Sequence, residues 1–199
     1  VDYRESEFSN RAEAIPLPSE PGGRNIFPLQ PDGSPDPREF TMDRRVTSNF
    51  GNFPQNVLGG AINAAYEFDA FELYGFATYS QRDSVLDFTY RAPGTSRTVD
   101  EIYPFGFRPR EEIREDDYEI VIGGRGEVAG FDVDVSRSYG TNETDWANTL
   151  GLNASLGVGS PKSFELGGID ADELVFQFDA TRRSDLGSAG VLQTSFGAQ

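Results

Sequence analysis

The sequence predicts an all-β protein, built as one antiparallel meander of about seven long strands that form a curved open sheet. Apolar and polar residues alternate over long stretches, with the period of two that places successive side chains on opposite faces of a strand. Only 37% of the residues are hydrophobic, whereas glycine (22 residues) and aromatic residues (13%) are plentiful. This composition is typical of many turns and half-exposed sheets. Short and long connections also alternate along the chain, as they do when one hairpin follows another.

The clearest element is a hairpin over residues 116–150. In its first arm Tyr118, Ile120 and Ile122 alternate with more polar neighbours, and the pattern resumes at Phe131 after a short link. Gly130 can adopt the positive φ that a tight turn requires. The second arm extends to residue 150, about 20 residues or ~66 Å at ~3.3 Å per residue. Soluble strands usually have ~5–6 residues, so this length is unusual.

The other elements follow from the same alternation and from the turn residues between the strands. Seven of the twelve prolines fall in 15–38, which predicts a long loop because proline cannot donate to a sheet ladder. Strands are expected over the start of 1–14, a short part of 39–48, 57–69, 71–90, 173–182 and the stretch after 190 that stops at residue 199. Loops or turns are expected over 49–56, 91–114, 151–170 and 184–190.

Composition and charge exclude several classes of function. The formal net charge of −16 disfavours nucleic acid, whose binding depends on phosphate neutralisation by Lys and Arg, and it equally disfavours an anionic inner leaflet. Cysteine and histidine are both absent, which removes thiolate sites, the commonest general base and the commonest zinc ligands. No signal peptide is expected at the start of the chain. No window is apolar enough for a transmembrane helix, but barrel strands alternate and would pass unnoticed in such a test.

The order of the connections predicts the kind of sheet. Short links near residues 69, 129 and 187 alternate with long ones at 91–114 and 151–170, so all short links fall at one end of a meander. Short periplasmic turns at one rim and long extracellular loops at the other are typical of outer-membrane barrels. The sequence therefore predicts a segment of a transmembrane β-barrel. Its longest arms would rise well above a lipid-facing band that is only ~25 Å tall.

Several stretches resemble TonB-dependent outer-membrane receptors, and together they cover nearly the whole chain in the family's order. They are FPLQPDGSPDPR at 27–38, LYGFATYSQRD at 73–83, IYPFGFRP at 102–109, SYGTNE at 138–143, LNASLG at 152–157 and SPKSF at 160–164. The resemblance implies that residues 1–199 are a partial barrel, about a third of its strands, without the plug domain, the TonB box or a closing strand that ends in an aromatic residue. Phe105 departs from the polar turn residue expected at its position.

The resemblance also implies a function, a location and partners. Receptors of this family import scarce ligands such as ferric siderophores, cobalamin or oligosaccharides, driven by the TonB complex, which pulls on the plug. The expected location is the bacterial outer membrane, and the expected partners are its lipid, the TonB complex acting through the missing plug, and an unknown small-molecule ligand, without nucleic acid. Two alternatives remain open: a secreted β-sandwich module for binding or adhesion, and a passive porin. A sandwich would bury Leu174, Phe176 and Phe178 in a two-layer core.

One loop carries the candidate ligand-binding residues, Tyr103, Phe105, Phe107, Arg108 and Arg110. Aromatic residues and arginine dominate recognition patches, and a planar guanidinium suits anionic chelates. The alternative is that these aromatic residues pack the loop against its neighbours. Acidic clusters lie at 111–117, 132–134 and 170–173, but none has the EF-hand spacing and none fixes a glycosidase pair. We therefore expect no metal, no cofactor and no enzymatic activity.

Arg137 conflicts with the pattern. It continues the apolar parity of Phe131, Val133 and Val135, where a cation near the membrane midplane would cost ~2–4 kcal/mol. Either a bulge shifts the register there, or the residue lies high enough to reach the head groups.

Overall fold

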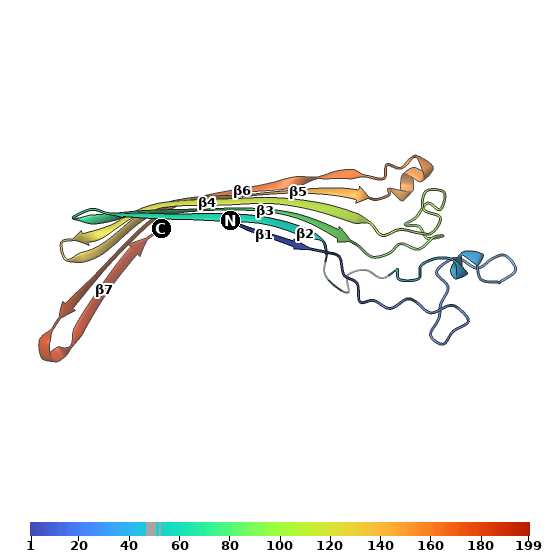
Figure 1. The fold of residues 1–199 in the computed structure, drawn as a ribbon, viewed down its shortest axis with the longest axis horizontal. Coiled ribbons are helices and arrows are strands. Elements are labelled where there is room, and N and C mark those ends of the chain that lie inside the picture. The colour runs from blue at the N-terminus through green and yellow to red at the C-terminus, as the bar shows by residue number, and fades with distance from the viewer. Residues whose placement is uncertain (47–50, 52) are drawn as a thin grey trace.

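The computed structural model describes residues 1–46, 51 and 53–199, and it consists of one open antiparallel sheet of seven strands in the order β1 to β7 (Figure 1). Every strand pairs with its sequence neighbours, so the sheet is an uninterrupted meander. The strands are β1 (Asp2–Ser6), β2 (Gln55–Glu67), β3 (Phe71–Asp87), β4 (Arg110–Val128), β5 (Phe131–Leu150), β6 (Phe164–Asp185) and β7 (Val191–Ala198). Three short 3-10 turns occupy Pro37–Phe40, Ala154–Gly159 and Gly187–Ala189. The all-β meander of seven long strands is thus confirmed.

The connections are arranged as predicted. Links 68–70, 129–130 and 186–190 are short and lie at one end of the sheet, whereas 7–54, 88–109 and 151–163 are long and lie at the other. Figure 1 shows the long connections gathered at the right, and the β6–β7 hairpin bending away from the other strands at the left. The turn between β4 and β5 has positive φ at both central residues, Ala129 (52°) and Gly130 (77°). Two such residues are characteristic of a type I′ hairpin turn.

The pairing register gives the sheet one apolar face and one polar face. Directly opposed residues share a face, so Ile62, Ala77, Ile120, Tyr139 and Leu174 form one row of the apolar face. Its side chains are open to solvent: Ile62 is 68% exposed and Phe176 is 61% exposed. The next row, on the polar face, contains Thr78, Glu119 and Glu173. No second layer covers either face in the described part of the chain, so the two-layer core of a β-sandwich is absent.

Side chains on the polar face form hydrogen bonds and ion pairs between neighbouring strands. Arg125 bonds Glu72 on β3, Arg82 bonds Glu115 on β4, and the Tyr74 hydroxyl donates to Asp134 Oδ1 at 2.7 Å. Tyr74 reaches Asp134 by lying over Gly123, where an added Cβ would stand 2.3 Å from the tyrosine ring. Glycine at position 123 therefore allows the aromatic ring to cross the strand between.

Strand boundaries differ from the prediction mainly next to the long loops. β5 has the expected end at Leu150, but β4 begins at Arg110, inside the predicted loop 91–114, and β6 begins at Phe164, inside the predicted loop 151–170. The Gly- and Ser-rich sequence of 151–170 favours a loop, but from Phe164 onward pairing with β5 overrides that local preference. A register shift between Trp146 and Ala147 accommodates the pairing.

The short strand expected within 39–48 is wrong for the part of it that the structure describes, 39–46; residues 47 and 48 lie outside the described residues. A 3-10 turn covers Pro37–Phe40, and Glu39 turns inward instead of joining a strand. Its carboxylate accepts hydrogen bonds from the backbone N–H groups of Ile26 (2.5 Å) and Phe27 (2.8 Å), and it forms a buried ion pair with Arg44. Ile26, Phe27 and Val46 form a small hydrophobic core beside this pair. The long β1–β2 loop is consequently packed around its own core.

The register around Arg137 is regular. Arg137 pairs with Ile122 on β4 and with Phe176 on β6 without a bulge, so the bulge considered for this position is wrong. The register shifts occur only at Arg110/Glu111 and Trp146/Ala147 among the described pairs. Arg137 therefore lies on the apolar face, one position on the turn side of Tyr139.

Candidate functional site

A cavity of about 580 Å³ lies at the loop end of the sheet, between the β1–β2 loop and the β3–β4 loop. All five residues predicted to contact a ligand line it: Tyr103, Phe105, Phe107, Arg108 and Arg110. The β1–β2 loop supplies the facing residues, among them Met42 and Arg45, and the end of β5 supplies Leu150. The volume lies within the range of small-molecule sites, about 300–1,000 Å³. The structure thus brings the predicted residues together around one space.

Stacked aromatic rings form one side of this cavity. The Tyr103 and Phe107 rings stack with centroids 4.1 Å apart, and the Tyr103 hydroxyl donates to the carbonyl of Gly151 at 3.1 Å. Phe107 is buried, whereas Phe105 is 47% exposed and meets Phe27 edge-on with centroids 6.1 Å apart. The aromatic residues of this loop therefore both pack it against its neighbours and expose ring surface to the cavity.

The tip of the β3–β4 loop is held by backbone contacts that depend on Gly106. Its φ is +69°, and a Cβ there would stand 2.4 Å from the carbonyl oxygen of Arg91. The Tyr90 hydroxyl donates to the carbonyl of Phe105 at 2.5 Å, and Arg91 pairs with Phe107 in an isolated bridge. These contacts fix the orientation of the aromatic rings.

The arginines of the site differ in what they bind. Arg110 forms an ion pair with Asp87, with Nε 2.7 Å from Oδ1, so its charge is already matched. The guanidinium groups of Arg108 and Arg45 have no hydrogen-bond or ion-pair partner among the described residues. Arg45 was not among the predicted site residues, because it is distant in sequence and only the folding of the β1–β2 loop onto the β3–β4 loop reveals it.

The tyrosines of the cavity remain neutral well above physiological pH. Burial raises the pKa of Tyr90 to about 12. Burial also raises the pKa of Tyr103 above its usual value. Both phenols are therefore uncharged at neutral pH and add no negative charge to the cavity.

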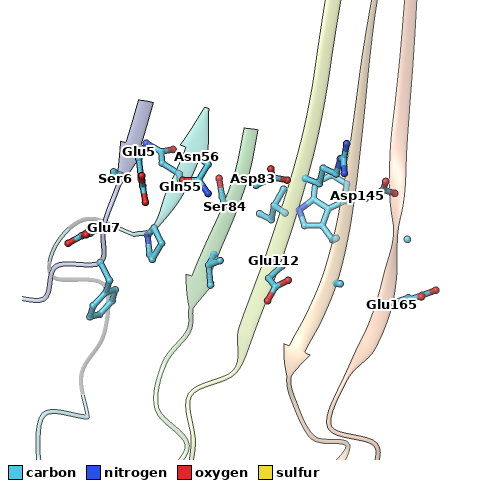
Figure 2. A pocket seen from close by; sticks show the side chains of 18 residues that line it. Glu5, Ser6, Glu7, Gln55, Asn56, Asp83, Ser84, Glu112, Asp145 and Glu165 are labelled. Carbon is cyan, nitrogen blue, oxygen red and sulfur yellow. The ribbon is translucent and has the colours of Figure 1, made fainter. Parts of the chain in front are cut away.

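A second cavity, of about 770 Å³, lies across the sheet between β1 and β6, and sequence reasoning did not predict it (Figure 2). Phe8, Ile113 and Trp146 contribute apolar surface, and six carboxylate residues line it: Glu5, Glu7, Asp83, Glu112, Asp145 and Glu165. Its one cation, Arg114, forms an ion pair with Asp116 at 3.0 Å. This cavity is therefore acidic. Its residues come from six strands and one loop, so no local sequence pattern could have indicated it.

Two further features are absent from the described residues. No group of three acidic, histidine or cysteine residues there could hold a metal ion. No helix in the described part of the chain is long and apolar enough to cross a membrane. Comparison with protein-family models, with curated protein sequences and with solved structures finds no match to this chain.

Proposed function

We propose that this chain forms part of the barrel wall of a TonB-dependent outer-membrane receptor, which imports a scarce ligand such as a ferric siderophore, cobalamin or an oligosaccharide. Its apolar face would contact outer-membrane lipid, its long loops would contribute to an external binding vestibule, and the TonB complex would act through a plug domain. Support comes from the open meander, from short links at one end and long loops at the other, and above all from the outline of the apolar face.

The observation that carries the proposal is a slanted upper limit of the apolar face. On successive strands the apolar face ends, toward the loops, at Leu174 on β6, Tyr139 on β5, Tyr118 on β4, Tyr79 on β3 and Leu58 on β2. On β5 the charged Arg137 interrupts this face directly below Tyr139. The cross-strand pairs place Leu174 level with Ile62 on β2. Leu58 is four residues closer to the loops than Ile62. The limit therefore rises by four residues over four inter-strand steps.

This slant matches the tilt of strands in a membrane barrel. Four residues at ~3.3 Å and four strand spacings of ~4.8 Å give an angle of about 35° between this limit and the perpendicular to the strands. When strands are tilted from the membrane normal, the membrane plane makes the same angle with the perpendicular to the strands. This tilt is ~35–45° in outer-membrane barrels.

The height of the apolar face also agrees with the lipid-facing band of outer-membrane barrels, which is ~25 Å tall. On β4 it runs from Val128 to Tyr118 without a charged residue. These ten steps span about 33 Å along the strand, or ~25 Å in height at a tilt of ~40°. Aromatic residues border the face at both ends: Phe71 and Phe131 lie near the short turns, and the three tyrosines of the upper limit lie toward the loops. Girdles of this kind flank the lipid-facing band of outer-membrane barrels.

The unpaired edges of the sheet favour the proposal that this sheet is part of a larger barrel. β1 pairs with only 55–59 of β2, and β7 with only 178–185 of β6. The rest of the outer edges of β2 and β6 presents unpaired backbone groups, which lipid cannot satisfy. In the proposed receptor, further strands pair with these edges and close the wall.

The test is a comparison of two neighbouring positions on β6. The chain has no cysteine, so Phe176→Cys and Gln177→Cys each introduce a unique spin-label site within it, one on the apolar face and one on the polar face. In the intact receptor in outer-membrane vesicles, we expect the label at 176 to be accessible to oxygen dissolved in lipid. The label at 177 should be accessible to a water-soluble nickel chelate. Water accessibility at both positions would exclude the proposed membrane orientation.

A further inference from the structure

We propose that the cavity of about 580 Å³ at the loop end binds an anionic ligand with a planar aromatic ring, held by the guanidinium groups of Arg45 and Arg108. This inference names the ligand class of the site, and only its role in import rests on the proposed function. The charge of the loop, two unpaired cations, the aromatic wall and the contrast with the second cavity support it.

The β3–β4 loop has the opposite charge to the rest of the chain. Residues 88–109 contain three arginines (91, 97 and 108) and two acidic residues (100 and 101), a formal charge of +1 within a chain of −16. All three cations are arginine, whose planar fork matches carboxylate geometry in two parallel hydrogen bonds. A local reversal of sign attracts anions to this loop and not to the neighbouring acidic strands.

Arg45 and Arg108 are the cations of the cavity that remain available. Arg110 is already paired with Asp87, and Arg38 nearby donates to Asp36 and to the carbonyl of Pro104. Neither Arg45 nor Arg108 has a side-chain partner among the described residues, although the chain has 33 acidic residues. The two groups come from different loops and line the same space, so one ligand carrying two negative charges can engage both.

The aromatic lining favours a planar ring in the uncharged part of the ligand. The stacked Tyr103–Phe107 pair and the exposed Phe105 offer ring surface, against which a planar ring gains contact in stacked or edge-on geometry. The phenols of Tyr90 and Tyr103 are neutral and do not repel a carboxylate, while their hydroxyl groups donate to the backbone carbonyls of Phe105 and Gly151. The proposed site has three arginines and two carboxylate residues, Asp43 and Asp87, in its lining. The cavity around Trp146 also offers an aromatic residue, but its six carboxylates against one arginine repel an anion.

The binding test uses the intact receptor in detergent micelles and isophthalate, a benzene ring with two carboxylates, as the probe. Three analogues separate the contributions: isophthalamide removes the charge, cis-cyclohexane-1,3-dicarboxylate removes the aromatic ring, and phenyltrimethylammonium reverses the charge. We expect isophthalate to bind at least tenfold more tightly than each analogue by isothermal titration calorimetry.

Variants assign the binding to the two guanidinium groups. Arg45→Gln and Arg108→Gln should each weaken isophthalate binding about tenfold, and the double variant about a hundredfold, as expected for lost charge-assisted hydrogen bonds. Arg97→Gln removes a cation from the same loop without touching the cavity and should change the affinity less than twofold. Phe105→Leu should weaken isophthalate binding but leave the cyclohexane analogue unchanged.

Several outcomes would overturn the inference: equal binding of isophthalate and isophthalamide, an equal loss in Arg97→Gln, or full affinity in the double variant. The spin-label comparison at 176 and 177 reports the membrane orientation without any ligand. Failure of the ligand assignment is therefore distinguishable from failure of the receptor assignment.

Discussion

Ala129 is the one non-glycine residue with positive φ in the part of the chain that the structure describes. It occupies the first central position of the type I′ turn between β4 and β5, where asparagine is strongly preferred because it tolerates the left-handed region. We expect Ala129→Asn to stabilise the folded protein by about 0.5–1 kcal/mol in urea unfolding from lipid vesicles. Ala70→Asn, in the neighbouring turn and without positive φ, is the control and should give no gain.

The buried pair of Glu39 and Arg44 holds the β1–β2 loop together. Glu39 is fully buried, and Arg44 also donates to the carbonyls of Ile15, Pro16 and Arg24. Removing one partner of a buried pair leaves an uncompensated charge and costs about 3–5 kcal/mol. Glu39→Gln should therefore increase the rate of proteolytic cleavage within this loop by more than a hundredfold. The exposed variant Glu13→Gln should leave the rate unchanged, and equal rates in both variants would contradict a structural role for the pair.

Arg137 tests the proposed depth of the membrane boundary. It lies one apolar-face position below Tyr139, so its long side chain can reach the head-group region. A cation near the interface costs ~0–1 kcal/mol, whereas one at the midplane costs ~2–4 kcal/mol. Arg137→Leu should thus change the free energy of unfolding from lipid vesicles by less than about 1 kcal/mol. Val135→Arg, one position deeper on the same strand, should destabilise the protein by about 2–4 kcal/mol. Equal effects would place the boundary elsewhere.

At the scale of the element, the long strands depend on uninterrupted alternation. A single-residue deletion moves every following side chain to the opposite face, whereas a two-residue deletion preserves the faces. Deleting Ser136 from β5 should therefore abolish assembly into the outer membrane. Deleting Ser136 together with Arg137 should retain a measurable folded fraction. Gel mobility before and after heating distinguishes folded from unfolded protein, and similar fractions for both deletions would contradict the two-faced sheet.

The sequence was most informative where one face of a strand is apolar. β5 and the apolar face of β4 follow from alternation alone, because side-chain direction has period two. Alternation did not assign the faces of β3, because Tyr74 and Phe76 lie on the face opposite to Leu73 and Ala77, and the pairing with β2 and β4 assigns them. The first half of β6 could not be predicted, since Gly167 and Gly168 favour a loop and only their pairing with Trp146 and Asp145 makes them strand residues. The short strand expected within 39–48 is wrong over 39–46, because Glu39 is bonded inside the loop core to Ile26, Phe27 and Arg44.

At the scale of the whole molecule, the isolated chain has an exposed apolar face and two unpaired edges. Both favour association when lipid is absent. We expect residues 1–199, expressed alone, to form large aggregates in buffer by light scattering and to remain dispersed in detergent. A monodisperse monomer without detergent would contradict the proposed lipid-facing surface.

In the candidate site, residues that are close in sequence could be predicted, whereas residues brought together only by folding could not. Tyr103, Phe105, Phe107, Arg108 and Arg110 lie within eight residues, so their grouping was visible in the sequence. Arg45 and the acidic cavity around Trp146 depend on contacts between segments that are far apart. No periodicity within a single strand encodes such contacts.

The length of β5 also determines the electrostatic surroundings of the site. In the proposed orientation, Leu150, which lines the cavity, is eleven residues beyond Tyr139 at the upper limit of the apolar face. That distance is about 36 Å along the strand and ~30 Å in height at a tilt of ~35°. The Debye length at physiological ionic strength is ≈ 8 Å, so lipid phosphates are screened from the cavity. An approaching anion would experience the field of the arginine-rich loop and not that of the membrane surface.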